Sequence, residues 1–107
     1  MKRTLLISSF ACILPLFMGS VFAADDGEKL FKNKTCVACH GADAKTPLMS
    51  LYPKLAGQNK DYAKQQMLDI KSGKRANGQS AAMKGVMHLV SDEEIEALAE
   101  YISGLVP

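Results

Sequence analysis

The sequence of 107 residues has no stretch in which apolar and polar residues alternate with a period of two. That alternation is the usual pattern of a half-buried β-strand, so its absence excludes a sheet and any βαβ unit. Cysteine is also scarce, with only Cys36 and Cys39 beyond the N-terminal segment, which itself contains Cys12. We therefore expect an all-α fold whose chemistry depends on very few thiols.

A long apolar run is absent except near the N-terminus, where Lys2 and Arg3 precede an apolar stretch that ends with Val21-Phe22-Ala23. This order is typical of a secretory signal peptide cleaved after a small residue. Polar residues and Pro15 interrupt the run, which disfavours the alternative of a retained membrane anchor. We expect residues 1–23 to be the signal peptide, residues 24–107 to form one domain, and the protein to reside in the periplasm. A domain this small often needs a cofactor to complete its core.

Helical periodicity and capping signals divide the domain into three helices and two loops. The first helix, capped by Asp25 or Asp26, is predicted to run directly into the cysteine motif. The second covers 61–72 and ends at a glycine. The third begins with the capping box Ser91-Asp92-Glu93-Glu94 and continues to residue 105. Residues 42–59 and 74–90 are predicted to be loops, and a loop as long as the first normally lines a site.

The run Cys36-Val37-Ala38-Cys39-His40 carries the clearest chemical signal in the chain. Two thiols spaced in this way with a following histidine suit covalent attachment of haem, with the imidazole binding iron. A thioredoxin-like dithiol would need a βαβ context, and zinc would need four ligands, for which only His88 is an obvious addition. A structural disulfide is the remaining alternative. The pattern favours one covalently attached haem c.

The sixth iron ligand would come from a methionine or from the second histidine. Met67 lies inside a predicted helix and Met49 follows a proline on the His40 side, so both are weaker candidates. Met83 and Met87 lie in the second predicted loop, where a thioether ligand is expected, and His88 is a further alternative.

The chain resembles a class I c-type cytochrome, and is most similar to one haem domain of the dihaem c-four-type cytochromes and to their small monohaem relatives. The resemblance covers essentially all of residues 25–105. The motifs that carry it are Gly27-x-x-x-Phe31, Cys36-x-x-Cys39-His40-Gly41, Pro53-Lys54-Leu55-Ala56-Gly57-Gln58, Tyr62 with Gln66, Gly73-Lys74-Arg75, Met83, and Ser91-Asp92-Glu93-Glu94-Ile95-x-x-Leu98-Ala99-x-Tyr101.

The resemblance implies the class I cytochrome c fold, with crossing terminal helices and loops that enclose the haem. It also implies that Met83 is the axial methionine, because the family places this residue eight positions before the serine of the last capping box. A proline carbonyl would hold the Nδ1 proton of His40, and we expect Pro47 in this role with Pro53 as the fallback. Arg75 is expected to pair with a haem propionate.

Axial ligands on both sides of the iron leave no vacancy for a substrate, so we predict an electron carrier and not an enzyme. The alternatives are a thiol redox or metal-binding protein with a free Cys-x-x-Cys, and a haem sensor with an open or His-filled sixth site.

The charges of the mature chain are unevenly distributed. Residues 29–84 contain all eleven cations of residues 24–107, whereas the ends contain eight of the eleven acidic residues. We expect a basic haem-edge surface that binds redox proteins, such as a quinol-oxidising complex and a terminal oxidase or reductase. We expect no nucleic acid partner, and membrane association only through those proteins.

Overall fold

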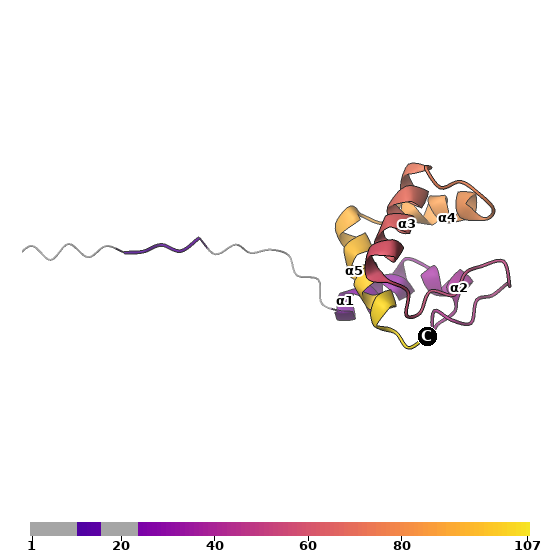
Figure 1. The fold of residues 1–107 in the computed structure, drawn as a ribbon, viewed down its shortest axis with the longest axis horizontal. Helices are drawn as coiled ribbons and strands as arrows, with labels where there is room; N and C mark the ends of the chain where they lie inside the picture. The colour runs from indigo at the N-terminus through magenta and orange to yellow at the C-terminus, as the bar shows by residue number, and fades with distance from the viewer. Residues whose placement is uncertain (1–10, 16–23) are drawn as a thin grey trace, which may run out of the picture.

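The computed structural model describes residues 11–15 and 24–107, and this part of the chain contains helices and no strand (Figure 1). The helices are α1 (Ala24–Asn33), α2 (Cys36–His40), α3 (Lys60–Ser72), α4 (Ser80–Met87) and α5 (Asp92–Gly104). The all-α prediction is therefore confirmed. The proposed cleavage site lies outside the described residues. None of the described helices is long and apolar enough to span a bilayer.

The two terminal helices, α1 and α5, pack against each other at Gly27. A Cβ atom at this position would collide with the carbonyl oxygen of Ala97 and with Cβ of Tyr101, so only glycine permits the approach. One turn further along α1, the ring of Phe31 lies 5.7 Å from that of Tyr101, and Phe31 is 1% exposed. This contact fixes the crossing of α1 and α5 that is visible in Figure 1.

The start of α5 follows its sequence signal closely. The Ser91 side chain accepts a hydrogen bond from the backbone N–H of Glu94, and the Glu94 carboxylate accepts one from the backbone N–H of Ser91. The second of these bonds lowers the pKa of Glu94. The predicted capping box is thus confirmed, and it fixes the first turn of the helix that packs on both α1 and α3.

Two predicted boundaries are wrong. The first helix does not run into the cysteine motif, because Thr35 adopts a left-handed conformation (φ 66°) that separates α1 from α2. Asp25 and Asp26 also do not precede α1, which already begins at Ala24.

The region 74–90 is not entirely a loop, because it contains α4. Its Ala-Ala-Met-Lys run consists of good helix formers, but the helix has no side-chain cap at Gln79 and packs on α3 alone among the described helices. The segment therefore becomes helical mainly because it packs on α3, since its own helix-start signal is weak.

The close approach at Gly27 yields a first prediction. Gly27→Ala should lower the free energy of unfolding by about 1–3 kcal/mol, because the added methyl group must push α1 away from α5. Gly104→Ala is the matched control, since its Cβ would meet no atom within 4 Å. Chemical denaturation of both variants measures the effect, and an equal stability change in the two would contradict the role assigned to Gly27.

Candidate functional site

The short helix α2 holds Cys36, Cys39 and His40 within slightly more than one turn. It begins after the left-handed Thr35 and ends at Gly41, whose φ of 85° is unfavourable for other residues. A Cβ atom at Gly41 would also collide with the carbonyl oxygen of Thr46. The backbone on both sides of the motif therefore turns sharply, and the two thiols and the imidazole stay together on one rigid element.

His40 is held in a defined orientation. Its side chain is nearly buried, at 7% exposed, and its Nδ1 lies 3.0 Å from the carbonyl oxygen of Pro53. Because a carbonyl oxygen only accepts, Nδ1 carries the proton and Nε2 is the nitrogen left for a metal. Burial lowers the pKa of His40, which favours the neutral imidazole that metals bind; the Pro53 contact opposes this shift.

The choice of Pro47 as the carbonyl partner of His40 is corrected by this geometry, and the fallback Pro53 takes the role. The loop after α2 is first tied back to the helix by a hydrogen bond from Leu48 N–H to Cys39 O at 2.9 Å. It then continues outward and returns only at Pro53. The path of this loop, and not the spacing of prolines in the sequence, decides which carbonyl reaches the ring.

No disulfide joins the two cysteines of the motif, and Cys36 is half-buried whereas Cys39 is exposed. Burial raises the pKa of Cys36 to about 11. Reactive dithiols have the opposite shift, because their chemistry needs a thiolate near neutral pH. Among the described residues, no group of three His, Cys, Asp or Glu side chains is placed to hold a metal ion. The raised pKa of Cys36 therefore disfavours a thiol-exchange role for the motif.

The methionines differ in their packing. Met87 and Met67 are core residues, at 2% and 6% exposed, whereas Met49 is 43% exposed on the loop after α2. Met83 on α4 is partly buried and packs on the edge of the same core. Met83 therefore combines contact with the core and an incompletely covered side chain.

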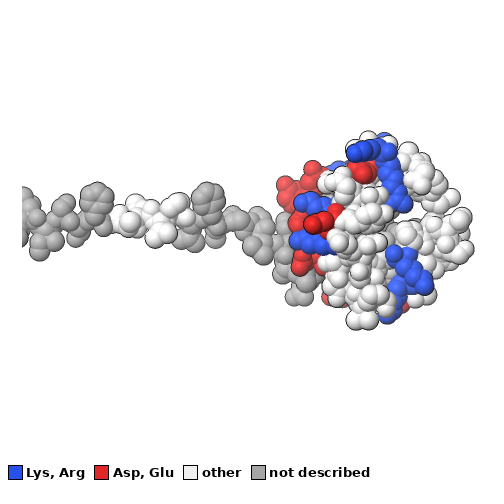
Figure 2. Space-filling view, in the orientation of Figure 1, with Lys and Arg blue, Asp and Glu red and all other residues white. Residues whose placement is uncertain are grey.

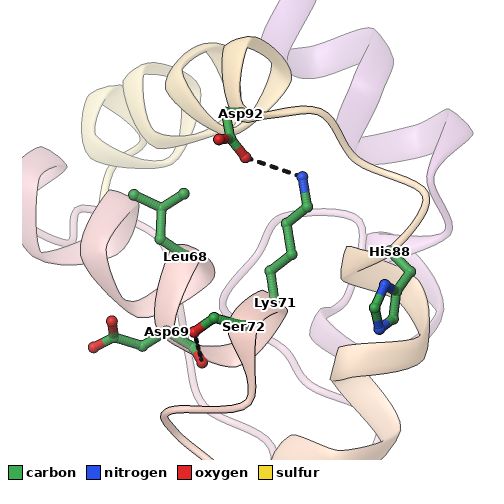
Figure 3. A pocket seen from close by; sticks show the side chains of 6 residues that line it. All are labelled: Leu68, Asp69, Lys71, Ser72, His88 and Asp92. Atoms are coloured by element: carbon green, nitrogen blue, oxygen red, sulfur yellow. Dashed lines mark hydrogen bonds and ion pairs between the residues drawn. The ribbon is translucent and has the colours of Figure 1, made fainter.

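His88 lies in a different environment. Its exposed side chain lines a shallow pocket between the end of α3 and the start of α5 (Figure 3). The other residues of this pocket are Leu68, Asp69, Lys71, Ser72 and Asp92. None of the haem-motif residues lines it, so this pocket is not the candidate site.

Arg75 is held by α3. Its Nη1 donates a hydrogen bond to Gln66 Oε1 at 3.1 Å, and its backbone N–H donates to Asp69 O at 3.0 Å. No described hydrogen bond links Arg75 to α2. Gln66 thus orients the guanidinium without neutralising it, which leaves its charge available to a carboxylate.

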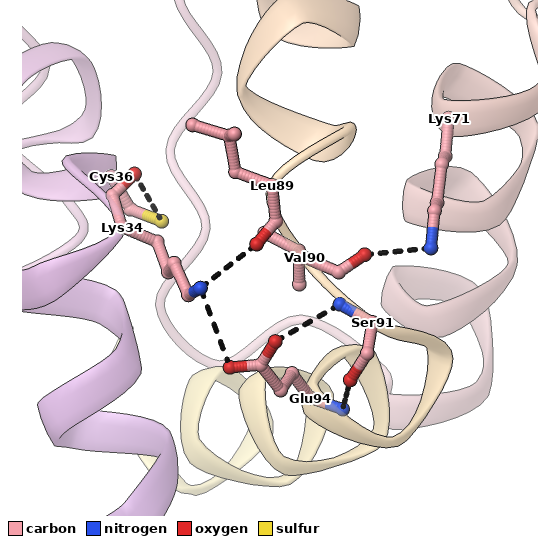
Figure 4. A network of polar contacts seen from close by, with 7 residues as sticks. All are labelled: Lys34, Cys36, Lys71, Leu89, Val90, Ser91 and Glu94. Carbon is pink, nitrogen blue, oxygen red and sulfur yellow. Dashed lines mark hydrogen bonds and ion pairs between the residues drawn. The ribbon is translucent and has the colours of Figure 1, made fainter.

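A polar network that sequence reasoning did not predict connects the cysteine segment with the segment before α5 (Figure 4). Lys34, two residues before Cys36, donates a hydrogen bond to Leu89 O at 2.8 Å and lies 3.6 Å from the carboxylate of Glu94. Lys71 of α3 reaches the neighbouring carbonyl, that of Val90, at 2.6 Å. These contacts join positions far apart in the chain, so local sequence signals do not predict them. The capping box predicted only that the Glu94 side chain would be held at the start of α5.

Comparison with known proteins agrees with this site. The family of cytochrome c matches residues 24–105. Cytochrome c4 of Stutzerimonas stutzeri is 37% identical over 100 residues, which cover 81% of this chain and 48% of that protein. Cytochrome c-553 of Nitratidesulfovibrio vulgaris is 33% identical over 105 residues, which cover 98% of this chain and all of that protein.

The fold is also similar to a solved structure, that of reduced recombinant cytochrome c4 from Pseudomonas stutzeri. The TM-score is 0.69 at 36% identity, over 78% of this chain and 48% of that one. The chain thus spans about half the length of the cytochrome c4 proteins that it matches. It belongs to the cytochrome c family, has the class I fold and binds haem c covalently.

Covalent attachment makes a direct chemical prediction. Mature protein from a host with haem-attachment machinery should not react with a thiol-alkylating reagent at Cys36 or Cys39, because both sulfurs are in thioether bonds. Intact-mass measurement should show the mass of one added haem. Residues 24–107 expressed without that machinery are the control and should take up two alkyl groups, because Cys12 is then absent. Alkylation of both thiols in the mature protein would contradict haem attachment.

Proposed function

We propose that this protein is a periplasmic carrier that shuttles one electron at a time between redox proteins of a respiratory chain, with His40 and Met83 as the axial ligands. The observation that carries the proposal is the fixed imidazole of His40, nearly buried beside two thiols, with its Nδ1 bound to Pro53. The signal peptide pattern of residues 1–23 supports the periplasmic location.

When bound, haem supplies one-electron chemistry at iron. The protein residues set the conditions for that chemistry. The Pro53 carbonyl holds the tautomer of His40, which fixes the ring and increases its basicity as a ligand. A thioether sulfur at Met83 favours the reduced metal, and this pairing gives a higher potential than two histidines. Two protein ligands exclude substrates from the metal, so the site transfers electrons without binding a reactant.

The axial assignment predicts a spectroscopic difference between two neighbouring methionines. Met83→Leu should abolish the weak absorption band of the ferric protein at about 700 nm that is expected for sulfur ligation, and should lower the potential. Met87→Leu is the matched control: it replaces a core methionine by a residue of similar volume and should keep the band at a stability cost below about 1.5 kcal/mol.

Other outcomes of this experiment identify the alternatives. Loss of the band only in Met87→Leu would make Met87 the ligand. Absence of the band from the wild-type protein would contradict methionine ligation. In that case, a spectrum changed by His88→Ala would indicate a bis-histidine haem, and an unchanged one would indicate an open sixth site.

The docking surface follows from which cations are already paired. Lys32, Lys34, Lys60, Lys64 and Lys71 form ion pairs with acidic residues of α1 and α5. Figure 2 shows the acidic side chains mainly over the side of the molecule where α5 lies in Figure 1, with lysines among them. Among the described residues, no ion pair involves Lys45, Lys54, Lys74, Arg75 or Lys84.

These unpaired cations flank two segments without any charge, 46–53 and 76–83. The first includes Leu48 and Leu51, which are 74% and 72% exposed. The two flanks of the second segment lie close in space, because the Lys84 ammonium is at the Cα of Gly73, next to Lys74. We define the loop surface as these two segments with their flanking cations. It offers an apolar centre with a basic rim to a partner whose contact face is apolar and ringed by acidic groups.

The cations of the loop surface predict that the rate of electron transfer depends on salt concentration. The net charge of residues 24–107, which is zero, would predict no such dependence. Electron transfer with the anionic reagent hexacyanoferrate should slow as ionic strength rises, although the mature chain has equal numbers of cations and acidic residues. Stopped-flow rates should be about 2–5-fold lower at low salt in the variant Lys45→Gln/Lys54→Gln. The control Lys60→Gln/Lys64→Gln changes the net charge equally but removes cations that are already paired. Equal effects in both variants would contradict docking at the loop surface.

A further inference from the structure

The segment between α4 and α5, residues 88–91, is bound by two ammonium groups on successive carbonyls. Lys34 binds Leu89 O at 2.8 Å, and Lys71 binds Val90 O at 2.6 Å (Figure 4). The two lysines come from opposite sides, one from the turn before α2 and one from the last turn of α3. We refer to residues 88–91 as the α4–α5 junction.

The α4–α5 junction is a rigid extension of α4. Backbone hydrogen bonds continue from the helix into it, from His88 N–H to Lys84 O at 3.1 Å and from Val90 N–H to Met87 O at 3.1 Å. At its other end α4 has no side-chain cap, and among the described helices it packs only on α3. The position of α4, and of Met83 on it, therefore depends on α3 and on whatever holds the junction.

Lys71 is unusually placed for a lysine in the last turn of a surface helix. Its side chain is 27% exposed, and its ammonium turns inward across the shallow pocket of Figure 3 to the Val90 carbonyl and to Asp92 Oδ1 at 3.0 Å. Asp92 is 72% exposed, so water screens this ion pair and it contributes little. The partly buried bond to Val90 O is the stronger contact, because its donor is charged.

We propose that Lys71 is a positioning residue for the axial methionine: by binding Val90 O, it holds the α4–α5 junction against α3 and keeps Met83 at the iron. This role rests on the proposed ligation by Met83. Lys34 holds the adjacent carbonyl from the α2 side, but Lys71 is the one that joins the junction to the same helix on which α4 packs. Loss of the Lys71 contact loosens the junction at the C-terminal end of α4 without removing any core side chain, while Lys34 and the buried Met87 and Val90 remain in place.

The test measures how easily an added ligand displaces the methionine. Imidazole is titrated into ferric holoprotein, and loss of the band at about 700 nm reports displacement of sulfur. Lys71→Met removes the ammonium but keeps the apolar stem, and it should raise the apparent affinity for imidazole about tenfold, since a hydrogen bond from a charged donor is lost. Lys71→Arg restores a donor of similar reach and should recover most of the wild-type affinity.

Lys64→Met is the matched control, because Lys64 lies on the same helix and pairs with Glu96 of α5 without touching the junction. Its imidazole affinity should stay within about twofold of the wild-type value. Hydrogen exchange gives a readout independent of haem spectra: in Lys71→Met, the amides of His88 and Val90 should exchange faster while those of α1 do not.

Two results would overturn the role of Lys71. One is an unchanged imidazole affinity in Lys71→Met, and the other is an equal rise in Lys64→Met, which would indicate a general loss of stability. A wild-type protein without the band at about 700 nm, or a Met83→Leu variant that keeps it, would instead refute ligation by Met83, and the positioning role would fail with it. Spectra of the wild type and of Met83→Leu, recorded before the titrations, thus distinguish the two failures.

Discussion

The close approach of α1 and α5 at Gly27 is the constraint on which the site depends. α1 leads within three residues to the helix with the thiols and His40, and α5 follows directly on the segment that carries Met83. Because no side chain separates the two backbones at Gly27, α1 and α5 lie in a fixed position relative to each other. The segments joined to them, α2 on one side and the segment with Met83 on the other, start from these fixed helices. The Phe31–Tyr101 contact extends this fixed region by a further turn. The contact between α1 and α5 therefore fixes the segments that lead to the two parts of the candidate haem site.

Two methionines and two histidines around this contact differ in their roles because they differ in burial. Met87 fills the core at 2% exposed, whereas Met83, one turn earlier on α4, lies at the edge of that core. His40 is buried and hydrogen-bonded, whereas His88 is exposed on the far side of the α4–α5 junction. The candidate methionine thus lies at the edge of the core, and the candidate histidine is buried but held in one orientation by a hydrogen bond.

Local signals in the sequence were sufficient for features determined within a few residues. The capping box at Ser91, the glycine that ends α3 and the Cys-x-x-Cys-His motif are of this type, and the first two appear as predicted. Features that depend on the path of a loop were not predictable in this way. The sequence prediction prefers Pro47, with Pro53 as the fallback, whereas the path of the loop after α2 brings the Pro53 carbonyl to His40. Likewise, α4 forms where it packs on α3. The hydrogen bonds from Lys34 to Leu89 and from Lys71 to Val90 join residues that are 55 and 19 positions apart.

The charge distribution shows the same difference between sequence and structure. Counted along the chain, the cations of residues 29–84 form one basic block, and the mature chain is formally neutral. In the fold, much of that block faces the acidic residues of α1 and α5: Lys60, for example, bridges Glu96 and Glu100, and this contact raises its pKa. Among the described residues, five of the six cations without an ion pair flank the two uncharged segments of the loop surface, and the sixth, Lys29, lies on α1. Neutrality of residues 24–107 is thus compatible with a locally positive surface, since five acidic residues of α1 and α5 are in ion pairs and an approaching partner senses the nearest side chains within about a Debye length.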